Sequence, residues 1–286
     1  MTSRNARTPI LVVGAAGTTG RRVTRMLGER GHETRPASRS SEWRFDWNDT
    51  DTWDRVLKGA GSMYLVQYDP EPLAPAFIER AVEHGVERVV LLSGRGIDDP
   101  DYLPEFFGNG EVTLGKGEEA VRASGAEWTI LRPGWFAQNL GEGMFGEDVR
   151  SGRVALPFGR GRVSWIDAED IAAVAVAALT EEGHHGRTYE LSGPAALDPE
   201  ETFAEISRAA GRSVEYAPVS VEEFVELRVG RGWSAEDART FATLLSPIRR
   251  GKDEALSDGV RRALGREARS FAEFARDAAA SGVWKA

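Results

Sequence analysis

Cysteine is absent from this 286-residue chain. Its absence excludes disulfides, a thiolate nucleophile and thiolate metal ligands. Histidine is scarce, and the neighbouring pair His184 and His185 has no suitably spaced partner for a zinc site. The sequence also lacks the Gly-x-Ser-x-Gly elbow that presents a serine nucleophile in α/β-hydrolases. We therefore expect neither a metal site nor Ser-His-Asp catalysis.

Long hydrophobic runs and an excess of positive charge are missing as well. No run of about 18 or more apolar residues occurs, so no transmembrane helix is expected. Residues 1–8 lack the apolar core of a signal peptide. The net charge of -9 argues against a nucleic-acid-binding surface. We expect a cytoplasmic monomer or homodimer whose partner is a small apolar or aromatic molecule, with no membrane or nucleic acid involved.

Glycine, by contrast, is abundant, and three glycines form the most informative motif of the chain. The apolar residues 10–13 predict a buried strand, and the sequence after Gly20 predicts an amphipathic helix. Between them stand Gly14, Gly17 and Gly20 in the spacing GxxGxxG. A glycine turn in this context is typical of a dinucleotide site, and an ordinary βα turn is the alternative.

Each glycine of this motif has an expected task. Gly14 permits a tight turn, Gly17 lets the backbone approach a pyrophosphate, and Gly20 lets the helix pack on the strand. The phosphates would bind unpaired N–H groups at the start of the helix. The cofactor contacts expected in this segment are Gly14, Ala16, Gly17, Thr18, Thr19 and Gly20.

The end of the second strand indicates which nicotinamide cofactor is bound. An acid there accepts from the ribose 2′-OH of NAD, whereas a basic residue suits the 2′-phosphate of NADP. Here Ser38, Arg39 and Ser40 follow one another, and no acid occurs until Glu42. A guanidinium flanked by hydroxyls suits a phosphate monoester. We expect NADP(H) to be preferred over NAD(H), with an exposed loop arginine as the alternative.

Strands and helices alternate along the first half of the chain. Mainly apolar segments at 62–66, 88–92 and 128–132 predict strands separated by helices. We therefore expect an α/β fold with a Rossmann-type doubly wound parallel sheet. Ligands bind at the carboxyl ends of such strands. The residues at the end of the third strand that are expected near the cofactor are Val66, Gln67 and Tyr68.

The second half of the chain is less regular. A strand is expected at 163–167, a helix at 168–180, and mainly helices from residue 198 onward. The helix starts are marked by capping residues: Asp198, Ser220, Ser234 and Ser270. The expected division is an NAD(P)-binding domain at 1–140, to which 163–182 returns, and a smaller substrate cap at 141–162 and 183–286.

A wider set of motifs carries a family resemblance over most of the chain. Beyond the glycine motif, it includes Ala37-Ser38-Arg39, Phe45-Asp46-Trp47, Leu91-Leu92-Ser93, the run from Trp128 to Pro133, and Asp167-Ala168-Glu169-Asp170. The set resembles the NmrA-like atypical short-chain dehydrogenase/reductase family. Within it, the nearest branch contains festuclavine-dehydrogenase-type and NAD(P)H:quinone-oxidoreductase-like proteins. That family combines reductases with cofactor-binding regulators that catalyse no reaction.

The resemblance implies roles for individual residues. Asp46, beside Trp47, would accept from the adenine amino group, unless it only forms a turn. Aligning Glu119 with the family's helix glutamate places Lys116 at the lysine of a Tyr-x-x-x-Lys pair, where it would hold the nicotinamide ribose. The tyrosine position is then Val112. The residues that would meet the nicotinamide are Pro133, Gly134, Trp135 and Phe136.

The missing tyrosine decides which chemistry fits. In related enzymes, that tyrosine protonates the carbonyl oxygen as hydride arrives. Without it, hydride addition to an iminium, quinone or conjugated acceptor fits better than ketone reduction. Tyr68 or Tyr102 would replace the acid, or each is a packing residue. Ser93 would orient a substrate carbonyl, or it caps its own turn.

The expected function is therefore NADPH-dependent hydride transfer to a conjugated, quinone, imine or polycyclic acceptor. Two alternatives remain open from the sequence. One is a non-catalytic NADP(H)-sensing regulator, and the other is an NAD(P)-dependent isomerase or epimerase. The aromatic residues Trp135, Phe136, Phe145 and Trp165 are expected either to line a substrate pocket or to belong to the core.

Overall fold

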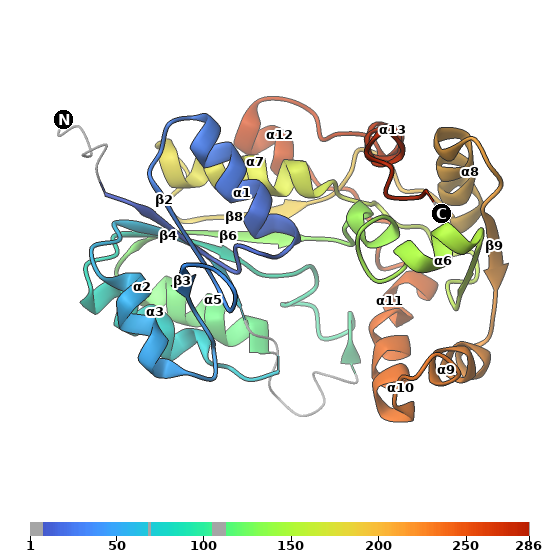
Figure 1. Ribbon diagram of the computed structural model, residues 1–286, viewed down its shortest axis with the longest axis horizontal. Coiled ribbons are helices and arrows are strands. Elements are labelled where there is room, and N and C mark those ends of the chain that lie inside the picture. Colours follow the sequence, from blue (N-terminus) through green and yellow to red (C-terminus); the bar gives the residue numbers. More distant parts are fainter. Residues whose placement is uncertain (1–7, 68–69, 105–112, 286) are drawn as a thin grey trace.

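A seven-stranded parallel sheet forms the centre of the molecule (Figure 1). The computed structural model describes residues 8–67, 70–104 and 113–285. Across the sheet the strands are β3 (Trp43–Arg44), β2 (Thr34–Ser38), β1 (Ile10–Val13), β4 (Ser62–Val66), β5 (Arg88–Leu92), β6 (Glu127–Pro133) and β8 (Arg187–Leu191). The order reverses between β1 and β4, the point at which doubly wound folds bind ligands. The expected Rossmann-type fold is confirmed.

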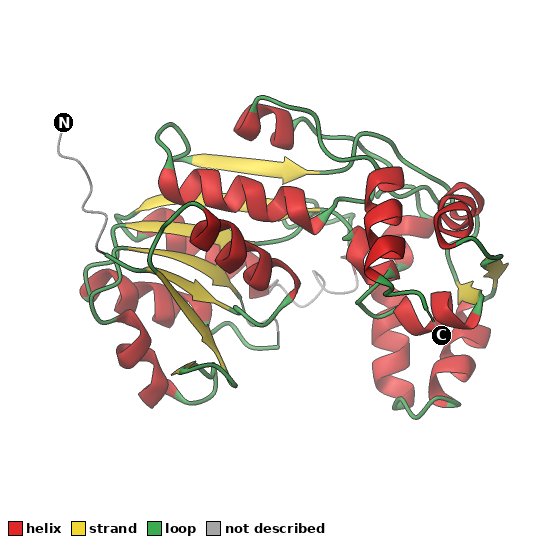
Figure 2. Ribbon diagram, turned by 45° about the horizontal axis from the view of Figure 1, so that its top comes forward, coloured by secondary structure: helices red, strands yellow, loops and turns green. Residues whose placement is uncertain are grey.

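Helices cover both faces of this sheet (Figure 2). Along β1, Ile10 and Val12 face one apolar core, and Leu11 and Val13 face the other, because side chains alternate along a strand. The first core is covered by α1 (Thr18–Glu29), α7 (Ala168–Thr180) and α12 (Gly259–Leu264). The second is covered by α2 (Trp53–Leu57), which follows η1 (Thr50–Thr52), by α3 (Ala74–Glu83) and by α5 (Thr113–Ala123).

A smaller, mainly helical cap lies beyond one end of the sheet (Figure 1). It has its own apolar core, in which Phe145 and Phe224 are fully buried. Its helices are η2 (Ala137–Leu140), α6 (Gly146–Ser151), α8 (Pro199–Ala210), α9 (Val221–Val229), α10 (Ala235–Leu244), α11 (Ser246–Arg249) and α13 (Phe271–Ser281). Two short parallel strands, β7 (Arg153–Leu156) and β9 (Glu215–Pro218), complete it.

The helix starts in the cap follow the sequence closely. Asp198, Ser220 and Ser270 each form a capping box with a glutamate three residues later. Ser234 accepts from the backbone N–H of Asp237. These predictions are confirmed. Caps can be predicted from the sequence because each is a local bond between a side chain and the backbone and needs no distant partner. Within the described residues, no helix is both long and apolar enough to cross a membrane.

Two expectations about the second half need correction. Residues 163–167 form no strand and make only isolated bridges, such as that between Val163 and Leu197. A buried extended connection has the same apolar pattern as a buried strand, so periodicity could not separate them. In addition, β8 and α12 lie within 183–286, yet β8 pairs with β6 and α12 packs on α7. Within the expected cap, β8 is therefore a strand of the main sheet, and α12 packs with the helices that cover this sheet.

Candidate functional site

The glycine turn between β1 and α1 is tightly packed. Gly14 has a φ of +78°, and a Cβ there would lie 2.9 Å from Cβ of Val66. A Cβ on Gly20 would lie 2.2 Å from the carbonyl oxygen of Gly14. The turn expected at Gly14 and the close packing expected at Gly20 are therefore observed. The pyrophosphate role of Gly17 stays a prediction.

The start of α1 is suited to an anion. Gly17 is the N-cap residue, no side chain caps the helix, and no acidic residue stands in its first turn. Ala16 and Gly17 are exposed, whereas Thr19 is buried and accepts from the Tyr64 hydroxyl at 2.9 Å. The Thr19 side chain is turned into the core, so its backbone N–H is the contact with a phosphate that we expect from this residue.

Arg39 lies in the turn after β2. It is exposed, and within the described residues it makes no hydrogen bond or ion pair. The turn itself is held by Ser41, whose hydroxyl accepts from the Ser38 N–H at 2.8 Å and donates to the Trp43 carbonyl at 2.9 Å. Arg39 therefore has no evident structural task, which fits the expected contact with a 2′-phosphate.

Asp46 and Trp47 have structural roles of their own. The Asp46 carboxylate accepts from the Asn48 N–H at 3.1 Å, which makes it a turn residue. Trp47 packs edge-on against Phe45, with ring centroids 5.1 Å apart, and against Phe77 at 5.4 Å. The turn interpretation of Asp46 is observed, and its contact with adenine stays a prediction.

Gln67 lies at the end of β4, between the end of β5 and helix α5. It is 8% exposed, and its Nε2 donates to the Leu92 carbonyl at 3.3 Å. Gly117 leaves room for it, since a Cβ there would lie 1.8 Å from Oε1 of Gln67. That Oε1 has no hydrogen-bond partner among the described residues. Tyr68, a candidate acid, lies outside the described residues.

A buried polar chain connects the ends of β5 and β6 with helix α5. The Ser93 hydroxyl donates to Oε1 of Glu118 at 2.6 Å. Arg132 forms a bidentate contact with the same carboxylate. Its Nε donates to Oε1 at 2.9 Å, and its Nη2 donates to Oε2 at 2.8 Å. Ser93 and Arg132 are each 7% exposed and Glu118 is 1% exposed. Burial raises the pKa of Glu118, but the bonds from Arg132 and Ser93 outweigh it and leave this pKa below its ordinary value.

Three further charged groups contact Glu118 or Arg132. Arg122 donates to Oε2 of Glu118 at 2.9 Å, and Arg132 also contacts Asp98 at 2.6 Å and Glu190 at 3.2 Å. The pKa of Arg132 is raised, mainly by its bonds to Glu118. Burial raises the pKa of Glu190. The sequence did not single out Glu118 or Arg132 for any role in the site.

The Lys116 assignment loses its motif support. It depended on Glu119 as the helix glutamate, but Glu119 is exposed and Glu118 is the glutamate that the fold buries. Adjacent residues on a helix face different directions, so the one-residue shift changes which side chain meets the sheet. Lys116 is half-buried on α5. Its contact with the ribose stays a prediction without that alignment.

Four of the five tyrosines are described, and each of their hydroxyls is hydrogen-bonded. The pairs are Tyr64 with Thr19 at 2.9 Å, Tyr102 with Asp253 at 2.7 Å, Tyr189 with His184 at 2.9 Å, and Tyr216 with the Leu156 carbonyl at 3.2 Å. Burial raises the pKa of Tyr64 and Tyr102, and it raises that of Tyr216 to about 12. Tyr102 is thus a packed, poorly acidic phenol and not a free acid.

The Tyr102 hydroxyl joins the loop after β5 to the segment that precedes α12. Its partner Asp253 is fully buried, and the backbone of this segment accepts from Arg95 at 3.1 Å. Arg250 donates to the carbonyl of Asp101 at 2.7 Å, and Lys252 contacts Asp99 at 3.2 Å. The loop after β5 is therefore fixed to residues 250–253 by several independent bonds.

Asp253→Asn is expected to make stability less dependent on pH. Burial raises the pKa of Asp253 despite the Tyr102 bond, so the native state loses stability as pH rises from about 4 through that raised pKa. Asparagine keeps an oxygen for Tyr102 and buries no charge. Chemical unfolding across this pH range should show that the free energy of unfolding of the variant increases relative to that of the wild type as pH rises. A pH-independent difference would contradict this account.

Residues 133–136 cross from the sheet to the cap. The Gly134 N–H donates to the Leu191 carbonyl at 2.9 Å, and a Cβ on Gly134 would lie 3.2 Å from Cζ of Arg95. Trp135 packs on the cap core and Phe136 on the main core, and both are half-buried. The other aromatic residues expected near the substrate are buried in the cap core: Phe145 and Trp165.

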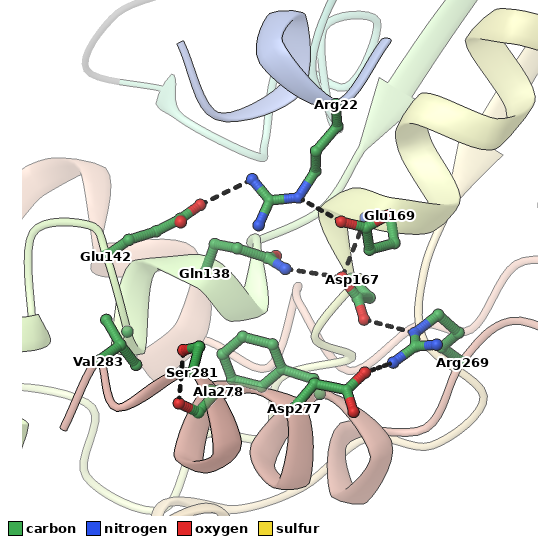
Figure 3. Close-up of a pocket in the computed structure, with 12 residues that line it drawn as sticks. Arg22, Gln138, Glu142, Asp167, Glu169, Arg269, Asp277, Ala278, Ser281 and Val283 are labelled. Carbon is green, nitrogen blue, oxygen red and sulfur yellow. Dashed lines mark hydrogen bonds and ion pairs between the residues drawn. The ribbon is translucent and has the colours of Figure 1, made fainter. Parts of the chain in front are cut away.

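A separate pocket of about 360 Å³ lies between α1, the loop after η2, the start of α7 and helix α13 (Figure 3). Its charged residues pair with one another. Arg22 contacts Glu169 at 2.9 Å and Glu142 at 2.8 Å, and Arg269 contacts Asp167 at 2.7 Å. None of the residues expected in the site lines this pocket.

Comparison with known proteins shows the family of the chain. A family described as NAD(P)H-binding matches residues 14–182. The NAD(P)H azoreductase of Xenophilus azovorans is 36% identical, over 95% of this chain and 98% of its own. Agroclavine dehydrogenase of Claviceps fusiformis is 30% identical, over 94% and 96%. The structure of the Escherichia coli quinone oxidoreductase QOR2 with NADPH has a TM-score of 0.74 at 21% identity, over 94% of this chain and 99% of that chain.

Proposed function

Because the chain belongs to the NAD(P)H-binding family of NmrA-like atypical short-chain dehydrogenases/reductases, we propose that it is an NADPH-dependent reductase of quinone, imine or similar conjugated acceptors. That it is an NAD(P)H-dependent oxidoreductase follows from the family and from its relatives. The preference for NADPH and the class of acceptor are the proposed parts. The cofactor would carry the redox chemistry, and the protein would supply orientation and electrostatics.

One observation supports the acceptor class: among the described residues, the two hydroxyls that follow β5 already donate their protons to carboxylates. Ser93 donates to Glu118, and Tyr102 donates to Asp253. Reduction of a simple ketone needs a proton at the oxygen as hydride arrives. Hydride addition to an iminium yields a neutral amine, and addition to a quinone yields a delocalised anion that takes its proton from water. Neither step requires an acid from the protein.

Turnover against a mixed panel of acceptors tests this proposal. NADPH consumption is followed with quinones, enones, imines and simple ketones, and calorimetry measures cofactor binding separately. We expect turnover of the conjugated or cationic acceptors and little of the ketones. Comparable rates with simple ketones would contradict the proposal. Tight NADPH binding with no turnover of any acceptor would favour a sensing regulator or an isomerase.

Arg39→Ala is expected to weaken NADPH binding roughly 10- to 100-fold, because a charge-assisted bond to the 2′-phosphate is lost. NADH has no such phosphate, so its affinity should change less than about 2-fold. Calorimetric titration of both cofactors measures the two effects.

Arg44→Ala is the matched control. Arg44 is also an exposed arginine close to the end of β2, but it lies 3.5 Å from the carboxylate of Asp49. Its loss should change neither affinity appreciably. Equal weakening of NADPH and NADH by Arg39→Ala would remove the 2′-phosphate assignment.

A further inference from the structure

The Ser93 hydroxyl has its only proton committed to a buried carboxylate. Its Oγ lies 2.6 Å from Oε1 of Glu118. Glu118 also receives N–H donors from Arg132 and Arg122, so it is ionised and has no proton to return. A serine hydroxyl has one proton and two acceptor lone pairs. Toward a second partner, Ser93 is therefore an acceptor.

The contacts of Arg132 with Glu118 keep Ser93 as the donor and Glu118 as the acceptor of their hydrogen bond. The two-pronged contact with Arg132 fixes the Glu118 carboxylate, and turning the Ser93 proton toward a ligand would break a charge-assisted bond. The carboxylate also polarises the hydroxyl, which makes its oxygen a stronger acceptor. The charges around Ser93 balance, because Glu118, Asp98 and Glu190 face Arg132, Arg122 and Arg95. A cationic partner is favoured by the Ser93 oxygen itself, because a positively charged N–H donor forms a stronger hydrogen bond with an acceptor than a neutral one does.

Ser93 lies where the reacting atoms are expected. Its N–H donates to the Leu131 carbonyl at 2.8 Å, and the Arg95 N–H donates to the Pro133 carbonyl at 3.0 Å. The segment after β5 thus runs beside the end of β6, where residues 133–136 are expected to meet the nicotinamide. The same edge of the sheet is where parallel α/β folds bind ligands.

We propose that Ser93 accepts a hydrogen bond from an N–H of the substrate, that Glu118 is the positioning residue which fixes this role, and that the site consequently selects protonated imines. This inference rests on the proposed function and names its preferred acceptor. It also replaces the expectation that Ser93 orients a carbonyl, since a carbonyl oxygen needs a donor.

The chemistry balances without a protein acid. Hydride leaves C4 of the reduced nicotinamide and bonds to the carbon of the C=N–H cation. The C=N π electron pair moves to nitrogen, which becomes a neutral secondary amine that keeps its proton. The cofactor is oxidised by two electrons and the imine is reduced by two. Ser93 would hold the N–H throughout, and no proton is transferred in this step.

Ser93→Ala tests the proposal with two acceptors of similar size, a protonated cyclic imine and a neutral quinone. We expect kcat/KM for the imine to fall roughly 10- to 100-fold, the effect of losing one hydrogen bond to a charged group, while that for the quinone changes less than about 3-fold. Equal losses, or a larger loss with the quinone, would overturn the proposal, because Ser93 would then serve as a donor or as a packing residue.

Glu118→Gln tests the positioning role of Glu118 while it leaves Ser93, the residue proposed to contact the substrate, in place. The amide retains an oxygen for Ser93 but removes the negative charge that polarises the hydroxyl, so the KM for the imine should rise more than kcat falls. Glu119→Gln, the exposed neighbour on the same helix, is the control and should leave both substrates unchanged. If Glu118→Gln does not fold, Ser93→Ala with the same two substrates decides the matter alone.

A binding measurement keeps this inference distinct from the proposed function. A cyclic secondary ammonium ion, which resembles the protonated product, is titrated into the complex with NADP⁺. Wild-type protein should bind it about 10-fold or more tightly than Ser93→Ala does, whether or not any acceptor is turned over. Equal affinities, or no binding to the wild type, would overturn the inference. An absence of turnover in the panel assay would contradict only the proposed function.

Discussion

Arg132→Met is expected to lower the free energy of unfolding by about 3–5 kcal/mol, because it leaves a buried carboxylate without its main cationic partner. Arg132 is 7% exposed, and its two contacts with Glu118 measure 2.9 and 2.8 Å. Methionine has a comparable length but supplies no N–H donors. The variant would therefore keep most of the packing and lose the charge compensation.

This loss should grow as the pH rises. Without the guanidinium, burial would raise the pKa of Glu118 above its unfolded value, so ionisation would cost stability as pH passes that pKa. Denaturant unfolding at about pH 5 and about pH 8 measures the difference. Arg122→Met is the control: Arg122 contacts the same carboxylate at 2.9 Å but its side chain is 38% exposed, and its loss should cost less than about 1 kcal/mol. Equal costs would show that burial does not set the strength of these contacts.

Features that depend on near neighbours in the chain were predictable. The apolar run at 62–66 coincides with β4, because a strand buried on both faces needs a continuous apolar segment. Asp198 and Ser270 marked helix starts through bonds to backbone groups three residues away. Pairing between distant segments was not predictable. Nothing local to residues 187–191 says that this strand joins the main sheet beside β6.

The same distinction applies to the site. The spacing of Gly14 and Gly20 is a local property, and it predicted the close packing of α1 on β1. The contacts of Glu118 with Ser93 and Arg132 join residues that are 25 and 14 positions apart. Which glutamate of α5 turns inward depends on the rotation of that helix against the sheet. One signal was available: an arginine that ends an apolar strand must be paired if it is buried.

Gly20→Ala is expected to weaken NADPH binding more than about 100-fold and to cost about 3 kcal/mol of stability, because the new methyl group has no space. A Cβ there would lie 2.2 Å from the Gly14 carbonyl oxygen and 2.9 Å from Cα of Ala15. Both contacts are with backbone, so the clash cannot be relieved by a side-chain rotation. The first turn of α1 must move away from β1, and the N–H groups expected to bind the pyrophosphate would move with it.

Gly28→Ala, in the last turn of the same helix, separates this clash from the ordinary effect of the substitution. A Cβ at Gly28 would meet nothing within 4 Å. Alanine favours a helix more than glycine does, so this variant should gain about 0.5–1 kcal/mol and bind NADPH as the wild type does. Thermal unfolding and calorimetric titration of both variants make the comparison. If Gly20→Ala were also stable and bound NADPH normally, α1 would tolerate displacement from β1, and the close approach at Gly20 would not be needed for the cofactor site.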